Sequence, residues 1–269
     1  MVKDGHVHTH FCPHGTNDPF ESYIEKALSL GYTEISFTEH APLPLSFTDP
    51  TPLRDSAMDH SDLEEYFAEV NALKKKYGDK IKINAGLEVD YIEGYEKETA
   101  KLLDKIGPKL DDAILSVHFL KDPFGYSCVD YSPDQFNCMI SAYGSIEQIH
   151  VNYYRTLFHS ILADLGPYKP KRIGHITLVN KFQLKFPAPR TFSKEITQVL
   201  KAMKEYGYEL DYNGAGTAKP LCREPYPPAD VIDQAVSLGI PLVYGSDAHR
   251  AKELGQGLDL MGKKLKNRQ

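Results

Sequence analysis

The sequence predicts an α/β fold in which about seven parallel strands, alternating with helices, close into a barrel. Three observations favour this class. Strand-like and helix-like segments alternate about seven times along the 269 residues, which is typical of parallel sheets with helical crossovers. No change in composition marks a second domain. Histidine or acidic residues stand at or just past the end of almost every predicted strand.

The predicted strands are short and contain apolar and β-branched residues bounded by turn signals. Residues 113–117, for example, form a short apolar run that ends at a histidine. The expected strands are residues 3–7, 34–39, 80–89, 113–117, 172–175, 208–211 and 242–247.

Helix signals fill the segments between these strands. Pro19 suits the first position of a helix and Gly31 its end, and Gly207 can end another. Between residues 61 and 77, apolar side chains recur on one stripe, as in an amphipathic helix. The expected helices are residues 18–30, 61–77, 95–106, 145–165, 191–206, 229–238 and 252–265.

Three long segments rich in proline, glycine or aspartate are expected to be loops, at residues 41–60, 119–143 and 213–227. Loops of such length inside a compact domain tend to be functional. In a barrel they would lie above the carboxyl ends of the strands. Their aromatic side chains could enclose a small ligand; these include Phe124, Tyr126, Tyr131 and Tyr226.

The composition excludes several classes of protein. The net charge is −6, so nothing favours a nucleic-acid polymer as partner. No apolar run approaches the roughly 18 residues that a membrane helix needs. The four cysteines lie far apart without CxxC spacing, as expected of a reduced, cytoplasmic protein. We therefore expect one domain over residues 1–269, in the cytoplasm and without a membrane partner.

The polar residues at the strand ends favour a closed barrel over an open sheet. In an open sheet, seven strand ends would be spread along about 30 Å and could not meet. In a barrel they form one rim, where active sites lie. With one histidine from the first loop, the candidate metal ligands are His6, His8, His14, His40, Glu88, His118, His175, Asp247 and His249.

This donor set indicates more than one metal ion. His6 and His8 alternate, so they point to the same face if the strand continues. Zinc takes about four ligands, and nine are enough for two or three ions if a carboxylate bridges them. Clustered divalent ions hold the attacking and leaving oxygens of a displacement at phosphorus and activate a nucleophile near neutral pH. Cys12, next to these histidines, is a further candidate ligand.

The motifs that contain these residues resemble, in order, those of the PHP superfamily, named for polymerase and histidinol phosphatase. The resemblance extends from residue 6 to residue 249, and the length and loops are similar to those of the histidinol-phosphatase branch. The motifs are His6-x-His8, His14, Thr38-Glu39-His40, Gly86-Leu-Glu88, Ser116-Val-His118, Gly174-His175 and Ser246-Asp247-Ala-His249.

The resemblance implies a distorted (β/α)7 TIM-like barrel with a trinuclear site. One ion would be held by His6, His8, Glu88 and Asp247. Glu88 would bridge to a second, held also by His118 and His175. The third would be held by His14, His40 and His249. Zinc, iron and manganese all suit such a site, whereas an imidazole-rich set disfavours magnesium.

The implied activity is a metal-dependent hydrolysis of L-histidinol phosphate to L-histidinol and phosphate, in histidine biosynthesis. The leaving alkoxide would be stabilised by a metal ion or protonated by a nearby acid, with Asp247 and His249 as the candidates. Arg155 and Arg190 resemble phosphate-contacting positions, and Arg223 and Arg250 are weaker candidates. Two alternatives remain open: a phosphoesterase that acts on a nucleotide or another small phosphate ester, and a metal-binding scaffold without turnover.

Overall fold

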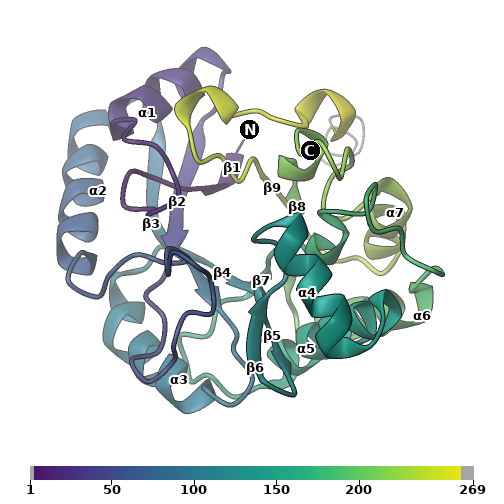
Figure 1. Cartoon of the computed structure of the whole chain (residues 1–269). Coiled ribbons are helices and arrows are strands. Elements are labelled where there is room, and N and C mark those ends of the chain that lie inside the picture. Colours follow the sequence, from purple (N-terminus) through teal and green to yellow (C-terminus); the bar gives the residue numbers. More distant parts are fainter. Residues whose placement is uncertain (1–2, 262–269) are drawn as a thin grey trace.

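Seven parallel strands form a ring at the centre of the molecule (Figure 1). The computed structural model describes residues 3–261. The strands of the ring pair in the order β1-β2-β3-β4-β7-β8-β9, and each neighbouring pair is parallel. Their bounds are β1 Lys3–Val7, β2 Glu34–His40, β3 Lys82–Asp90, β4 Asp112–Ser116, β7 Arg172–Ile173, β8 Glu209–Asn213 and β9 Leu242–Gly245.

The last strand meets the first along an irregular seam. The backbone amide of His8 donates to the carbonyl of Ala248 at 2.9 Å. Nearer the amino end of β1, the side chain of Asp4 accepts a hydrogen bond from the backbone amide of Ser246 at 2.9 Å, in the role that a backbone carbonyl has in a regular sheet. The ring is therefore nearly closed, and the predicted distorted (β/α)7 barrel is confirmed.

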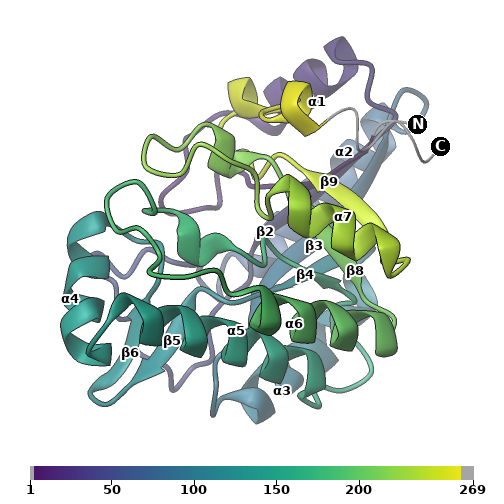
Figure 2. The ribbon, with the colours of Figure 1, turned by 90° about the vertical axis from the view of Figure 1, so that its right-hand side faces the viewer.

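Helices surround the ring and enclose an apolar layer between themselves and the strands (Figures 1 and 2). Phe37 of β2, for instance, is fully buried and contacts the rings of Phe20 and Tyr23 in the first helix. No helix within residues 3–261 is long and apolar enough to cross a membrane. The helices are α1 Phe20–Ser29, α2 Leu63–Tyr77, α3 Glu96–Ile106, α4 Pro133–Tyr143, α5 Ile146–Leu162, α6 Ser193–Glu205 and α7 Ala229–Ser237.

The amino end of the barrel interior is polar. Arg172, the first residue of β7, is 2% exposed and donates to the carbonyl of Gly5 at 2.8 Å. Its guanidinium also pairs with Asp112 at 3.1 Å, and Lys3 pairs with the same carboxylate at 3.1 Å. A Cβ at position 5 would lie 2.8 Å from Nη1 of Arg172. Glycine is thus required there for the close approach of the arginine.

The segment from 119 to 143, expected to be a loop, contains ordered secondary structure. Strands β5 (Phe119–Asp122) and β6 (Gly125–Cys128) form an antiparallel hairpin, and α4 follows. Ser132 caps this helix by accepting a hydrogen bond from the Gln135 amide at 3.1 Å. The prediction was wrong because the capping serine, followed by proline at the first helical position, was not taken as a helix start.

The C-terminal segment differs from the single helix expected over residues 252–265. A short 3₁₀ turn at Ala251–Glu253 is followed by Gly255 and Gly257, whose φ angles are +87° and +78°. These left-handed glycines interrupt the helix, which resumes at residue 258. Residues 262–265 of the predicted helix lie outside the described residues.

Candidate metal centre

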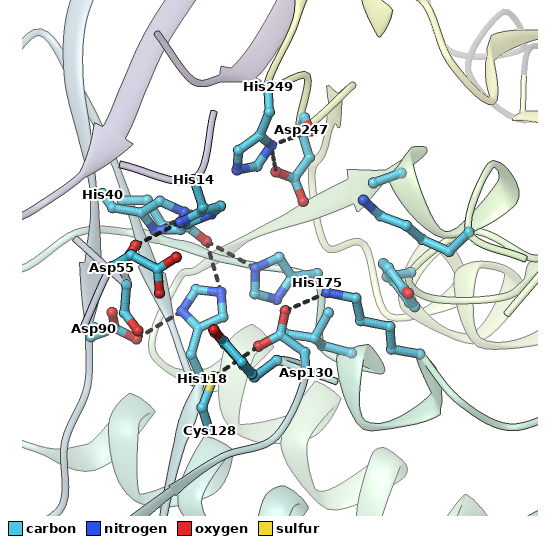
Figure 3. A pocket seen from close by; sticks show the side chains of 18 of the residues that line it. His14, His40, Asp55, Asp90, His118, Cys128, Asp130, His175, Asp247 and His249 are labelled. Carbon is cyan, nitrogen blue, oxygen red and sulfur yellow. Dashed lines mark hydrogen bonds and ion pairs between the residues drawn. The ribbon is translucent and has the colours of Figure 1, made fainter. Parts of the chain in front are cut away.

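The carboxyl end of the barrel holds a cavity of about 280 Å³ surrounded by histidines and carboxylates (Figure 3). β1 contains His6 and is followed by His8, β2 ends at His40, and β3 carries Glu88. The structure brings all nine candidate ligands of the sequence into this region. Those that line the cavity directly are His14, His40, Glu88, His118, His175, Asp247 and His249.

His6 and His8 alternate along the chain and point into the same space, next to an irregularity in the first strand. The pairing of β1 with β2 shifts between Asp4 and Val7. The Nε2 atoms of His6 and His8 lie 3.2 Å apart. Two nitrogen lone pairs at this separation suit a shared proton or a cation.

Glu88 is the centre of the site. Its side chain is 1% exposed, and the hydroxyl group of Ser116 donates a hydrogen bond to Oε1 of Glu88 at 2.5 Å. One carboxylate oxygen faces some of the histidines and the other oxygen faces the rest, as expected of a carboxylate that bridges two cations. Oε2 lies 3.3 Å from His6 Nε2, 3.4 Å from His8 Nε2 and 3.3 Å from His40 Nδ1, and Oε1 lies 2.9 Å from His175 Nε2 and 3.8 Å from His118 Nε2.

Within residues 3–261, potential ligand atoms cluster in three places, each with atoms within 4.8 Å of one another. The first two clusters agree with the two ion positions expected around Glu88. The third contains Cys12 and His8 in place of His14. The ring of His14 is nevertheless close, with its centroid 5.1 Å from that of His40 and 5.0 Å from that of His249. The clusters are His6, His8 and Asp247; Glu88, His118 and His175; and His8, Cys12, His40 and His249.

Several of these imidazoles are oriented by a hydrogen bond at Nδ1, which leaves Nε2 for the site. Metal-binding histidines commonly have this arrangement, with a carboxylate or carbonyl behind the ring. The carboxylates Glu39, Asp90 and Asp211 were not identified from the sequence. Glu39 and Asp90 stand in strands that also carry a candidate ligand, and Asp211 is the last residue of the predicted strand 208–211; these positions were the available signal. The pairs are His6 with Asp211 at 2.8 Å, His8 with Glu39 at 3.2 Å, His118 with Asp90 at 2.8 Å, and His14 with the Asp55 carbonyl at 2.7 Å.

Glu88 and Asp247 favour their ionised forms in spite of their burial. Desolvation acts to raise the pKa of Glu88, but the charges of His6 and His118 hold it well below its ordinary value. Desolvation likewise opposes the charge of Asp247, and His6 and His8 keep its pKa well below the usual range. Buried negative charge of this kind attracts cations.

The histidines fall into two electrostatic classes. Burial lowers the pKa values of His6, His8 and His118, but nearby carboxylates outweigh it and raise that of His8 to about 9 and that of His118 to about 10. Burial and the charge of His8 lower the pKa values of His40 and His249 well below the ordinary value. Their Nε2 atoms have no hydrogen-bond partner among residues 3–261. A divalent cation would supply that partner and displace the protons of the other class, so the donor set fits metal.

The two arginines expected to contact phosphate lie away from the cavity. Arg155 is exposed on α5, and Arg190 is exposed before α6. The guanidinium of Arg190 pairs with Glu147 and Glu195, both at 2.6 Å. Neither arginine is among the residues that line the cavity. Arg155 lies on a helix and Arg190 just before one, so neither side chain is placed at the carboxyl end of a strand.

Other cationic side chains line the cavity instead of these two arginines. Lys181, Lys219 and Arg250 line the cavity, and Lys181 pairs with Asp130 at 2.8 Å. Of these, only Arg250 was a candidate from the sequence. The two lysines follow β7 and β8, so their position after a strand was the signal that sequence reasoning missed.

The aromatic residues of the long loops are divided between two environments. Tyr131 and Tyr226 line the cavity. Phe124 is 87% exposed, and Tyr126 packs against Phe47 in a separate cluster with a centroid distance of 5.1 Å. Two of the four aromatics named from the sequence can therefore contact a ligand in the cavity.

Replacing Asp211 by asparagine should weaken metal binding, because Asp211 fixes the His6 ring through Nδ1. Loss of such an outer partner typically costs about 10- to 100-fold in metal affinity or activity. Metal titration of the stripped protein, followed by competition with a chelator, measures this change. Glu205→Gln, on the exposed side of α6, is the control and should bind as the parent protein does. Equal affinity in the two variants would contradict the role of Asp211.

Comparison with known proteins places this site in a family. The model of the PHP domain matches residues 4–215. The chain is 50% identical to histidinol-phosphatase of Bacillus subtilis over 255 residues, which cover 94% of this chain and 95% of that protein. It is 28% identical to histidinol-phosphatase of Lactococcus lactis, over 93% of this chain and 84% of that protein.

Solved structures agree with these relationships. A crystal structure of a Listeria monocytogenes protein matches with a TM-score of 0.91 and 41% identity, covering 96% of this chain and 99% of that one. The fold is also similar to that of histidinol phosphate phosphatase from Lactococcus lactis, crystallised with zinc, L-histidinol and phosphate. That match has a TM-score of 0.69 and 20% identity and covers 97% of this chain and 93% of that one.

Proposed function

We propose a function on the premise that this chain belongs to the PHP domain family, which the match over residues 4–215 shows. The chain is a phosphoric monoester hydrolase that converts L-histidinol phosphate to L-histidinol and phosphate. The 50% identity to the Bacillus subtilis histidinol-phosphatase over 94% of the chain supports this activity. The observation that carries the proposal is the convergence of imidazoles on the buried carboxylate of Glu88 at the end of the barrel.

The site would hold two or three divalent transition-metal ions. His6, His8, Glu88 and Asp247 would hold the first; Glu88, His118 and His175 the second; and His14, His40 and His249 the third. Bound ions would act as Lewis acids that stabilise negative charge on the phosphoryl group and activate water. Imidazole ligands suit zinc, iron and manganese, and the Lactococcus lactis structure contains zinc.

Asp247 or His249 is assigned the transfer of a proton to the leaving alkoxide. Both side chains favour the unprotonated form, so the one that acts would first take the proton lost by the attacking water and then pass it to the alkoxide. The side chains of Asp247 and His249 are 14% and 21% exposed, whereas those of His6, His8 and Glu88 are at most 1% exposed. Asp247 and His249 therefore reach the side of the centre from which a substrate enters. Lys219 is close enough to His249 to help lower its pKa, after the larger effects of burial and His8.

Cations on the cavity wall orient the phosphoryl group. Lys181, Lys219 and Arg250 line the cavity, and their positive charge complements a phosphate dianion. Asp130 accepts a hydrogen bond from Lys181 at 2.8 Å and thereby fixes the position of the ammonium group of Lys181.

The four cysteines are free thiols, which agrees with the cytoplasmic location that we propose.

Metal removal and restoration tests the function. We expect the protein loaded with zinc or manganese to release phosphate from L-histidinol phosphate and the chelator-stripped protein to lose this activity, because charge stabilisation depends on the ions. Readdition of metal should restore it. Mononucleotides serve as competing substrates. If the loaded protein released phosphate from mononucleotides and none from L-histidinol phosphate, the proposed substrate would be wrong.

A further inference from the structure

The carboxylates that line the cavity differ in whether they already have a cationic partner. Glu88 and Asp247 face the histidines, and Asp90 pairs with His118. Asp130 pairs with Lys181, and Glu253 lies 3.6 Å from Arg250. Asp55 also lines the cavity, yet it forms no ion pair within the described part of the chain. Asp55 is therefore the carboxylate of the cavity wall whose negative charge remains available to a bound ligand.

The loop from 41 to 60 holds Asp55 in a fixed position beside the metal centre. Its backbone carbonyl accepts a hydrogen bond from His14 Nδ1 at 2.7 Å, and the preceding residue, Arg54, has a φ of +53°. Asp49 braces the turn by accepting hydrogen bonds from the amides of Thr51 at 2.9 Å and Ser56 at 3.1 Å. A non-glycine residue held in this left-handed region is a constraint of the kind found at functional sites.

The position of Asp55 matches the chemistry of the substrate. In L-histidinol phosphate the ammonium nitrogen and the ester oxygen are bonded to adjacent carbon atoms. An ammonium group must therefore bind immediately beside the phosphoryl site. Figure 3 shows Asp55 next to His14 and His40, two of the residues proposed to hold the third ion, on the wall of the same cavity.

We propose that the carboxylate of Asp55 binds the ammonium group of the substrate and makes the site selective for phosphate esters that carry a primary amine next to the ester. This inference rests on the proposed function. Asp55 has two separable parts: its carbonyl orients His14, and its side chain recognises the substrate. An asparagine at this position retains the carbonyl and the shape but removes the negative charge.

The test compares two substrates in Asp55→Asn. One is L-histidinol phosphate, and the other is its desamino analogue, imidazolylpropyl phosphate. For the first, we expect kcat/KM to fall by about 10- to 100-fold, the usual range for a lost charge-assisted hydrogen bond. For the second, kcat/KM should stay the same or rise, because a negative charge beside the phosphate dianion has been removed. Asp55→Glu should recover part of the preference for the amine.

Two controls separate recognition from structure. Asp59→Asn removes a charge from the same loop at an exposed position that does not line the cavity, and it should leave both substrates unaffected. Metal content of Asp55→Asn, measured by mass spectrometry, should equal that of the parent because the carbonyl to His14 remains. Equal losses for both substrates, or no loss for either, would overturn the role of Asp55. Failure of the parent protein to hydrolyse L-histidinol phosphate would instead overturn the proposed function itself.

Discussion

Replacing Glu88 by glutamine should lower kcat about a thousandfold or more and reduce the metal bound per chain by at least one ion. Glu88 faces imidazoles through both carboxylate oxygens. A glutamine presents one neutral oxygen and one amide nitrogen, so it cannot bridge two cations. Loss of one ion removes several kcal/mol of charge stabilisation from the transition state. Each 1.36 kcal/mol changes the rate about tenfold.

The electrostatic surroundings of Glu88 add to this effect. Its negative charge contributes to raising the pKa values of His6 and His118. Without it, the site loses a buried negative charge that attracts cations. The substitution should therefore weaken both ion positions proposed to share Glu88, and added metal should restore little activity.

Metal analysis and steady-state kinetics on the same samples measure the result. Glu25→Gln, which changes an exposed glutamate on α1, is the control and should keep full metal content and rate. Circular dichroism establishes that Glu88→Gln is folded. A folded variant with parental metal content and parental kcat would show that Glu88 does not bridge ions, and the arrangement proposed for the centre would fail.

Residues at the ends of strands could be predicted from the sequence because the position of such a side chain depends on little more than the fold. Once the barrel is assumed, His40 at the end of β2 and His175 just past β7 must both face the rim. The same reasoning could have found Asp90, which lies two positions after Glu88 in β3 and so on the same face. It was not predicted because the expected strand ended at residue 89, one position before it.

Residues on helices and loops could not be placed in this way. Whether Arg190 faces the cavity depends on how its segment packs, and two glutamates hold its guanidinium on the exposed surface. Lys181 reaches the cavity because a 3₁₀ turn at Leu178–Asn180 carries it there. Neither fact follows from local propensity, because both are decided by tertiary contacts among distant residues.

Replacing Arg172 by methionine should destabilise the metal-free protein by about 3–5 kcal/mol, the usual cost of removing one partner of a buried ion pair. Methionine fills much of the same space but leaves the carbonyl of Gly5 without its donor. Asp112 would keep Lys3 and the hydroxyl of Ser36 as partners, which favours the lower end of this range. Urea unfolding followed by circular dichroism, with chelator present, gives the free energy of unfolding without a contribution from bound metal.

The pH dependence of this loss identifies its cause. Burial acts to raise the pKa of Asp112, but Arg172 and then Lys3 hold it below its ordinary value. A carboxylate whose pKa is lowered on folding stabilises the protein above its unfolded pKa, about 3.9, and this stabilisation is lost as the pH falls through the folded pKa. The difference in stability between the parent and Arg172→Met should therefore be constant from neutral pH down to about 4 and shrink as the pH falls below about 4, through the lowered folded pKa of Asp112. Arg155→Met, at an exposed arginine on α5, should show no such dependence. A difference that stays constant below about pH 4 as well would mean that Arg172 acts through packing, because only its interaction with the Asp112 charge disappears on protonation.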